Sequence, residues 1–284
     1  NSWDGTLKIH DIKTGKRLHY FELKEGAAYV SLFSKNDLYV FTATLGDNTD
    51  KLQMREVDSK KIVRTFEGHT DVIASLTLSK DGKKLLSASW DGPIRLWDVA
   101  TGLAERKFTA HQGAVHVALF NNTETGMYSA GADRTIKQWD VNTGKVLKTF
   151  EGHVAEVTSL ILTPDEKMLI SHSVDGVTKF WDLTTGKEFF EHIHLGEKEW
   201  MVKNPEGYFN GTDGARQYIH FVDGLNTYGV DQFFHEFYRP DLLPRIFQSR
   251  GNENLKGIQG KLNSAPPPGI KIATLPGDDA TQTE

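Results

Sequence analysis

A 42-residue repeat constrains the fold of this chain more than any other feature of its sequence. Four residue types recur at that interval through the middle of the chain, and each keeps its place relative to the others. They are the histidines His69, His111 and His153, the serines Ser87, Ser129 and Ser171, the aspartates Asp91, Asp133 and Asp175, and the tryptophans Trp97, Trp139 and Trp181. Register held over three copies indicates a duplicated structural unit.

Apolar residues within each unit alternate with polar ones, which predicts short β-strands. A first strand follows each histidine. Second strands are expected at 85–89, 127–131 and 168–173, third strands at 94–99, 136–141 and 177–183, and a fourth strand at 146–150. Gly-containing turns separate these runs, including the Thr-Gly pairs at 101–102, 143–144 and 185–186. Each unit therefore reads as four antiparallel strands.

Gly-His pairs at 68–69 and 152–153 and Trp-Asp pairs at 97–98, 139–140 and 181–182 complete the pattern. It resembles the WD-repeat family of β-propellers. The resemblance implies an all-β fold: a WD-repeat β-propeller that is incomplete within this chain and has seven blades when closed, with a short helical C-terminal extension. An open ring exposes two edge strands. We therefore expect the remainder of the same polypeptide, or another chain, to close it.

The repeat weakens outside 68–190. Residues 6–9 resemble the third strand of an earlier, truncated unit, with His10 at the tryptophan position. Residues 26–66 form a further unit in which Ala27 replaces the histidine and Arg55 the tryptophan. We predict propeller blades over 1–193, a degenerate last blade or a β-hairpin module over 194–225, a helical extension over 226–262, and a Pro-rich linker with a mobile tail over 263–284.

The recurring His, Ser and Asp supply a base, a nucleophile and an orienting acid, which invites a hydrolase interpretation. An active site does not usually occur in triplicate around a ring. In the WD-repeat family the same residues and the tryptophan form a hydrogen-bonded network that joins the turn before strand one to the turn before strand three. The resemblance thus implies a structural role for all twelve residues, and we expect no catalytic residue and no enzyme activity within this chain.

Composition excludes several other classes of function. The chain has no cysteine, so it forms no disulfide framework and no thiolate site, and it fits a reducing, cytoplasmic compartment. Its net charge of −5, without a basic cluster, disfavours nucleic-acid binding, and no apolar run is long enough to cross a membrane. His192 and His194 lack a third ligand, and the loop at 47–50 lacks the Gly and Glu of a calcium loop. We expect no metal and no cofactor.

Propellers of this family usually bind partners on the face that carries the turns before strands one and three, called the top face below. The residue before each turn aspartate points onto it, which brings Trp3 and Trp90 to the same rim. We predict a partner-binding surface made of Trp3, Trp90, Val72, His116 and Glu156. Exposed tryptophans are typical anchors of protein interfaces. The alternative is that both tryptophans pack on neighbouring blades.

Aromatic residues are concentrated in 200–247, which predicts that this segment buries a surface. Asp231 can cap a helix that carries Phe233, Phe234 and Phe237 on one stripe, and Pro240 ends it. Residues 241–247 indicate a second short helix. The extension either docks on the last blade and covers its edge, or presents the stripe to a partner or to another copy of the chain.

The sequences Asn-Pro-Glu-Gly-Tyr-Phe-Asn-Gly at 204–211, Gln-Phe-Phe at 232–234 and Phe-Tyr-Arg-Pro-Asp-Leu-Leu at 237–243 precede a Pro-Pro linker. This arrangement resembles the junction between WD repeats and a caspase-like peptidase domain in large bacterial proteins. It implies a non-catalytic scaffold or regulatory module of such a protein. The alternatives are the regulatory fragment of a protease whose catalytic domain lies outside this chain, and a structural module for self-assembly.

Overall fold

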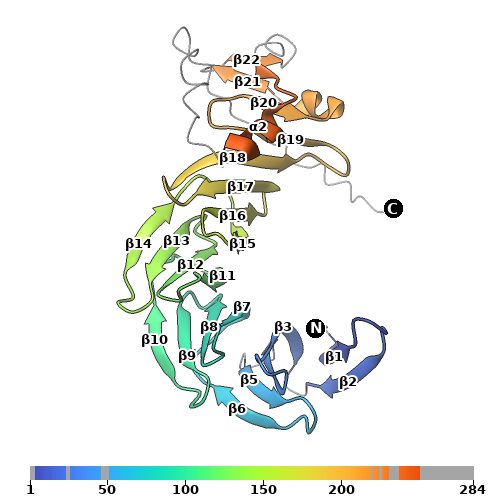
Figure 1. The fold of residues 1–284 in the computed structure, drawn as a ribbon, viewed down its shortest axis with the longest axis vertical. Coiled ribbons are helices and arrows are strands. Elements are labelled where there is room, and N and C mark those ends of the chain that lie inside the picture. Colours follow the sequence, from blue (N-terminus) through green and yellow to red (C-terminus); the bar gives the residue numbers. More distant parts are fainter. Residues whose placement is uncertain are drawn as a thin grey trace, which may run out of the picture. The chain divides into compact units, whose positions relative to one another are not determined.

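The computed structural model describes residues 4–23, 26–45, 51–218, 220–223, 226–229 and 237–249 (Figure 1). It divides into two compact units, Asn1–Asp175 and Gly176–Glu284, which are described separately. Trp3, Asp231, Phe233, Phe234, the loop at 47–50 and everything after residue 249 lie outside the described residues.

Unit 1 is built of antiparallel strands in sequence order (Figure 1). Its strands are β1 (Thr6–His10), β2 (Arg17–Glu22), β3 (Ala27–Phe33), β4 (Tyr39–Leu45), β5 (Lys51–Glu56), β6 (Ile62–Phe66), β7 (Ile73–Leu78), β8 (Lys84–Ser89), β9 (Ile94–Asp98), β10 (Ala104–Phe108), β11 (Val115–Phe120), β12 (Gly126–Gly131), β13 (Ile136–Asp140), β14 (Val146–Phe150), β15 (Val157–Leu162) and β16 (Met168–Ser173). Strands β3–β6, β7–β10 and β11–β14 form four-stranded sheets, β1 pairs with β2, and β15 pairs with β16.

The turn between the third and fourth strands shows how local sequence sets the sheet. In the β9–β10 turn, the Asp98 carboxylate accepts hydrogen bonds from the Thr101 N–H and hydroxyl, both at 2.8 Å. Gly102 follows at φ 77°, a conformation that a side chain disfavours, and its N–H donates to the Asp98 carbonyl at 2.8 Å. The Thr-Gly turn signal therefore marks a closed hairpin, as predicted.

Apolar side chains fill the spaces between neighbouring sheets. One core joins Phe41 and Phe66 to Ile73, Leu85 and Trp97 of the next sheet. A second core joins the opposite face of that sheet to the sheet after it, through Leu86, Ile94, Phe108, Val115 and Met127 among others. Strand β7 contacts β3 on one side and β11 on the other, and β11 contacts β15. Each sheet thus packs face to face on the next through its first strand, which is the blade arrangement of a β-propeller and confirms the predicted fold class.

The residue equivalences in the β3–β6 blade differ from those that a 42-residue step predicts. Ala28 lies at the bulge of β3 opposite Thr44, just as Ile73 lies at the bulge of β7 opposite Ser89. Ala27 is therefore a strand residue and does not occupy the histidine position, which corresponds to residue 24. The longer loop before β5 shifts the first two strands relative to the repeat. The same register places Thr42 at the serine position, whereas Arg55 does occupy the tryptophan position in β5.

Unit 2 contains four antiparallel strands in the order β17 (Val177–Asp182), β18 (Lys187–His194), β19 (Trp200–Lys203) and β20 (Phe209–Gly211). A 3₁₀ helix, η1 (Asp213–Tyr218), and a hairpin of β21 (His220–Asp223) and β22 (Asn226–Gly229) follow. Strand β19 pairs directly with β18, and β20 with β19. The chain after 194 thus extends an existing sheet with a hairpin, and β19 and β20 do not begin a separate four-stranded blade.

The described part of the extension packs on this sheet. Phe237 is buried beside Tyr208, with ring centroids 6.2 Å apart, in a core with Ile193 and Met201. Tyr238 bridges to Phe209, and the Arg239 N–H donates to the Phe209 carbonyl at 2.8 Å, so this segment covers the edge of β20. Helix α2 (Leu242–Ser249), which matches the predicted second short helix, then packs Leu242 against Phe190 and Val202. No helix in the described part of the chain is long and apolar enough to span a bilayer.

Candidate functional site

The repeated polar residues form a connected hydrogen-bond network in the β7–β10 blade. The Trp97 indole N–H donates to the Ser87 hydroxyl at 2.8 Å, and that hydroxyl is 2.6 Å from His69 Nε2. His69 Nδ1 lies 3.0 Å from the Asp91 carboxylate, which also accepts the Thr70 N–H at 3.2 Å. The network therefore joins the turn before β7 to the turn before β9.

A neutral His69 satisfies every atom of this network. If Nδ1–H donates to Asp91, Nε2 accepts the Ser87 proton while the Ser87 oxygen accepts the Trp97 N–H. Burial lowers the pKa of His69 against the opposing effect of Asp91, which favours this neutral form. Burial acts to raise the pKa of Asp91, but its hydrogen bonds to His69 and Thr70, together with the positive charge that His69 gains in acid, outweigh burial and lower the pKa to about 2.

The β11–β14 blade repeats this geometry. The Trp139 N–H donates to Ser129 at 2.7 Å, Ser129 is 2.7 Å from His111 Nε2, and His111 Nδ1 is 2.9 Å from Asp133. Although burial opposes it, hydrogen bonding to His111 holds the pKa of Asp133 well below its usual range. In the third copy, His153 Nε2 lies 2.7 Å from Ser171 within unit 1, and the Asp175 N–H reaches Ser173 at 3.5 Å. Trp181 belongs to β17 of unit 2 and is buried there.

The network geometry does not suit nucleophilic catalysis. Ser87, Ser129 and Ser171 are each 0% exposed, so no substrate reaches their hydroxyl oxygens. The oxygens of Ser87 and Ser129 also accept an indole N–H, which occupies a lone pair that an attacking nucleophile needs.

An aromatic row crosses the top face of unit 1. Trp90, 40% exposed, lies edge-on between Tyr29 and His116, with centroid distances of 6.0 and 6.3 Å. His116 Nε2 is 2.8 Å from a carboxylate oxygen of Glu156, whose side chain is 50% exposed. Tyr29, Trp90, His116 and Glu156 come from four successive blades, and together they are called the top-face row below.

The other two residues of the predicted surface, Val72 and Trp3, are not part of the top-face row. Val72 is only 4% exposed, so its side chain belongs to the core and does not line the surface as predicted. Its carbonyl accepts the Trp90 N–H at 2.9 Å, which fixes the base of Trp90. Ala132 and Val174 precede the turn aspartates of the next two copies, as Trp90 does in its own; Ala132 is half-buried and Val174 is 63% exposed. Trp3 lies outside the described residues.

Sequence reasoning missed Tyr29. The bulge in each first strand turns one residue toward the top face, and this residue is Tyr29 in β3, Ala74 in β7 and His116 in β11. Alignment on the bulge, rather than on the 42-residue step, would have identified it. His192 stacks on Trp200, with ring planes 13° apart and centroids 6.1 Å apart. No group of three metal-ligating side chains occurs among the residues that the structure describes.

Comparison with known proteins identifies the repeat. The family model of the WD domain, G-beta repeat, matches residues 60–98, 103–140 and 144–182. These three segments match WD40 repeats. They contain the His, Ser, Asp and Trp of all three predicted units, and each begins one strand before the predicted unit, with the outer strand β6, β10 or β14.

Short segments of the chain also resemble curated proteins. Small ribosomal subunit protein RACK1 of Saccharomyces cerevisiae is 58% identical over 40 residues, which are 14% of this chain and 12% of that protein. Retinoblastoma-binding-like protein E of Dictyostelium discoideum is 51% identical over 51 residues, 18% of this chain and 10% of that protein. MST50-interacting protein 11 of Pyricularia oryzae is 44% identical over 45 residues, 16% and 14% of the two chains. The chain thus spans a small fraction of each relative, about one repeat.

Proposed function

We propose that this chain is a non-catalytic interaction module that binds a protein partner on the top face of its blades. The observation that carries this proposal is the top-face row: Trp90 packs on aromatic rings of both neighbouring blades, as the alternative interpretation expected, and yet it remains 40% exposed. Large aromatic side chains that stay in contact with water are characteristic anchors of protein interfaces. Names such as Retinoblastoma-binding-like protein E and MST50-interacting protein 11 agree with a binding role for WD40 repeats.

Rigid presentation is the proposed mechanism of binding. The backbone on both sides of Trp90 is fixed, because its N–H donates to the Val72 carbonyl and the following Asp91 is held by His69. A partner that contacts this row would therefore pay little conformational entropy to order it. In this interpretation the His–Ser–Asp–Trp networks serve binding indirectly, since they hold the turns that carry the row.

Comparison of surface variants tests the proposal. The chain is immobilised, proteins that it retains are identified, and the dissociation constant of each is measured for the wild type, Trp90→Ala, Glu156→Arg and Leu147→Ala. Leu147 is a matched control, because it is 61% exposed on the outer strand β14, away from the row. A hot-spot contribution of about 2 kcal/mol predicts about 30-fold weaker binding for Trp90→Ala. Equal affinities for Trp90→Ala and Leu147→Ala would overturn the proposal.

We further propose that the module belongs to a larger cytoplasmic protein of bacterial origin, with a caspase-like peptidase domain after residue 284. The resemblance of the motifs at 204–211 and 237–243 to the junction before such a domain supports this. The reading frame beyond Glu284 tests this part. We expect it to encode a domain with the His and Cys that a caspase-like peptidase needs. If no such domain follows, the peptidase proposal is wrong, and the top-face proposal is unaffected.

Self-assembly through the extension is less well supported. Phe237, the described member of the predicted stripe, is 9% exposed and packs within unit 2 against Tyr208 and Met201. Phe237→Ser should therefore destabilise the chain rather than change its association state. Sedimentation velocity of a folded Phe237→Ser variant distinguishes packing within the chain from association between chains. Lost association with unchanged stability would support the self-assembly interpretation.

A further inference from the structure

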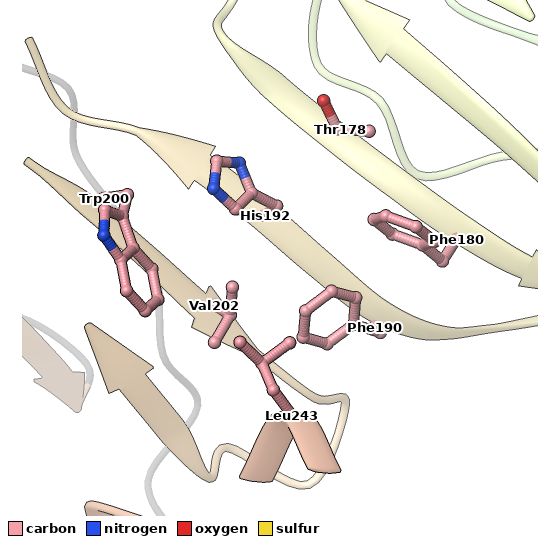
Figure 2. Close-up of a pocket in the computed structure, with 7 residues that line it drawn as sticks. All are labelled: Thr178, Phe180, Phe190, His192, Trp200, Val202 and Leu243. Atoms are coloured by element: carbon pink, nitrogen blue, oxygen red, sulfur yellow. The ribbon is translucent and has the colours of Figure 1, made fainter. Parts of the chain in front are cut away.

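An aromatic pocket of about 440 Å³ opens on one face of the unit 2 sheet (Figure 2). Thr178 and Phe180 of β17, Phe190 and His192 of β18, Trp200 and Val202 of β19, and Leu243 of α2 line it. Figure 2 shows the side chains of the three strands on the same side of the sheet, with Leu243 reaching toward them from the helix. Its volume lies in the range of sites that bind ligands or peptide side chains.

The repeat shows how this face differs from the corresponding face of an earlier blade. The pocket residues Thr178, Phe180 and His192 correspond, in steps of 84 residues, to Ile94, Leu96 and Phe108. The earlier set packs against the following blade through Val115, Ala118 and Met127. In unit 2, among the described residues, this face is covered only in part, by Leu242, Leu243 and Ile246 of the short helix α2.

We propose that the proline run at 266–268 of this same chain docks into the pocket. Aromatic-lined grooves bind Pro-rich segments because the polyproline II conformation is already formed and costs little entropy to order. The pocket presents a stacked His192–Trp200 pair and two phenylalanines, and Trp200 adds an indole N–H donor for a backbone carbonyl. A lining of this kind suits proline rings better than it suits charged groups.

The length of chain after α2 favours an intramolecular occupant. Leu243 lines the pocket, and Ser249, the last residue of α2, is about 9 Å further along the helix axis at about 1.5 Å per residue. Pro266 follows Ser249 by 17 positions. A flexible segment of that length has a root-mean-square span of about 20–25 Å, so the proline run can return to the pocket. This inference does not depend on the top-face proposal, because the two sites lie in different units.

Tryptic cleavage of the full chain measures docking, because Lys271 lies three residues after Pro268 and a docked segment resists cleavage. The rate at Lys271 is compared with that at Lys256, within the same tail but before the proline run. A tethered segment at an effective concentration of about 1 mM, with a dissociation constant of about 0.1 mM, is protected about tenfold. The triple substitution P266A/P267A/P268A should remove this protection, whereas the control Pro276→Ala should retain it.

Pocket variants leave the tail sequence unchanged and locate the docking site. Thr178→Arg places a charged side chain in the pocket and should accelerate cleavage at Lys271 about tenfold, while the similar-sized Thr178→Val should not. If the triple variant accelerates cleavage and Thr178→Arg, folded by circular dichroism, does not, the proline run docks elsewhere and the proposal is wrong. Equal cleavage in the wild type and the triple variant would show that the run does not dock at all.

The indole signal of Trp200 provides a second readout that does not require Thr178→Arg to fold. In ¹H–¹⁵N spectra of the full chain this signal should shift on the triple substitution and return toward its original position when a peptide of residues 262–273 is added. An unchanged Trp200 signal in both experiments would overturn the assignment of the pocket as the docking site.

Discussion

Two buried hydroxyl groups at the same position of successive blades should respond in opposite ways to removal. Ser87 is 0% exposed and connects Trp97 Nε1 to His69 Nε2. Thr42, its counterpart in the β3–β6 blade, is also 0% exposed, but its hydroxyl has no hydrogen-bond partner among the described residues. The same chemical deletion thus breaks two hydrogen bonds in one blade and none in the other.

The cost of Ser87→Ala follows from the groups that it leaves behind. The Trp97 N–H and His69 Nε2 each lose their partner in a buried position, at about 1–3 kcal/mol for each unsatisfied group. Some relaxation of the histidine reduces the sum, so we expect a loss of about 2–4 kcal/mol in the free energy of unfolding. Thr42→Val keeps the shape of the side chain and removes an unpaired polar atom, so it should be neutral or stabilise by up to about 1 kcal/mol.

Urea unfolding with amide hydrogen exchange of β4 and β8 measures both changes, because exchange reports the stability of each blade locally. Protection in β8 should fall in Ser87→Ala, and protection in β4 should hold or rise in Thr42→Val. If Ser87→Ala costs less than about 0.5 kcal/mol, or if Thr42→Val costs as much as Ser87→Ala, the network does not stabilise the blade in the way that its geometry indicates.

Three further predictions concern the same unit. Trp90→Ala should lower the free energy of unfolding by about 1–3 kcal/mol, because it removes two edge-on aromatic contacts, and calorimetry measures this; an unchanged melting temperature would show that Trp90 serves binding alone. Gly131→Ala should lower the free energy of unfolding in urea by about 1–3 kcal/mol, because its new Cβ would lie 2.1 Å from the Ala114 carbonyl oxygen. The control Gly15→Ala meets no neighbouring atom within 4 Å, so its only cost is the strain of a side chain at positive φ. Acid should destabilise the chain in two steps, since the lowered pKa of His69 gives stability that declines as pH falls below about 6.5, and the lowered pKa values of Asp91 (about 2) and Asp133 give stability that declines below about pH 4; in Asp91→Asn, urea midpoints measured against pH should show a smaller second step, because Asp133 still contributes to it.

The sequence predicted the blades well because one period determines both strand positions and side-chain contacts. The predicted strands at 127–131, 136–141 and 146–150 agree with β12, β13 and β14 to within one residue. The network distances within the β7–β10 and β11–β14 blades are those that a conserved spacing of His, Ser, Asp and Trp requires. Where the period holds, local propensity and tertiary packing give the same answer.

The prediction was less accurate where the period is interrupted. The loop before β5 moves the register of β3 and β4, so counting residues placed Ala27 at the histidine position although it lies within a strand. Val72 was assigned to the surface because it flanks a strand, but residues next to a strand can turn either way, and packing against the neighbouring blade decides. Strands β19 and β20 have no repeat to align with, so their pairing on β18 depends on tertiary contacts that a sequence pattern does not contain.

Hydrogen bonds also link successive blades on the face opposite the top face, and this contact changes at the third copy of the repeat. The Lys80 N–H donates to the Glu124 carboxylate of the next blade, and the Asn122 N–H donates to Glu166 in the same way. The next position in this series is Pro164, which has no N–H to donate.

The same copy of the repeat also loses the apolar residues that pack on a following blade. Ile94 and Ile136 become Thr178, and Phe108 and Phe150 become His192. In this copy, residues at three positions, Pro164 in a turn, Thr178 in β17 and His192 in β18, thus lack the groups that contact the following blade in the earlier copies. We infer that the neighbour of this copy is not another blade of the same type, which agrees with a sheet in unit 2 that is extended by β19 and β20 and covered by α2. A Pro164→Lys/Thr178→Ile/His192→Phe variant would recreate the repeat face. It should expose more apolar surface and aggregate more readily than the wild type in light scattering, and unchanged solubility would contradict this reasoning.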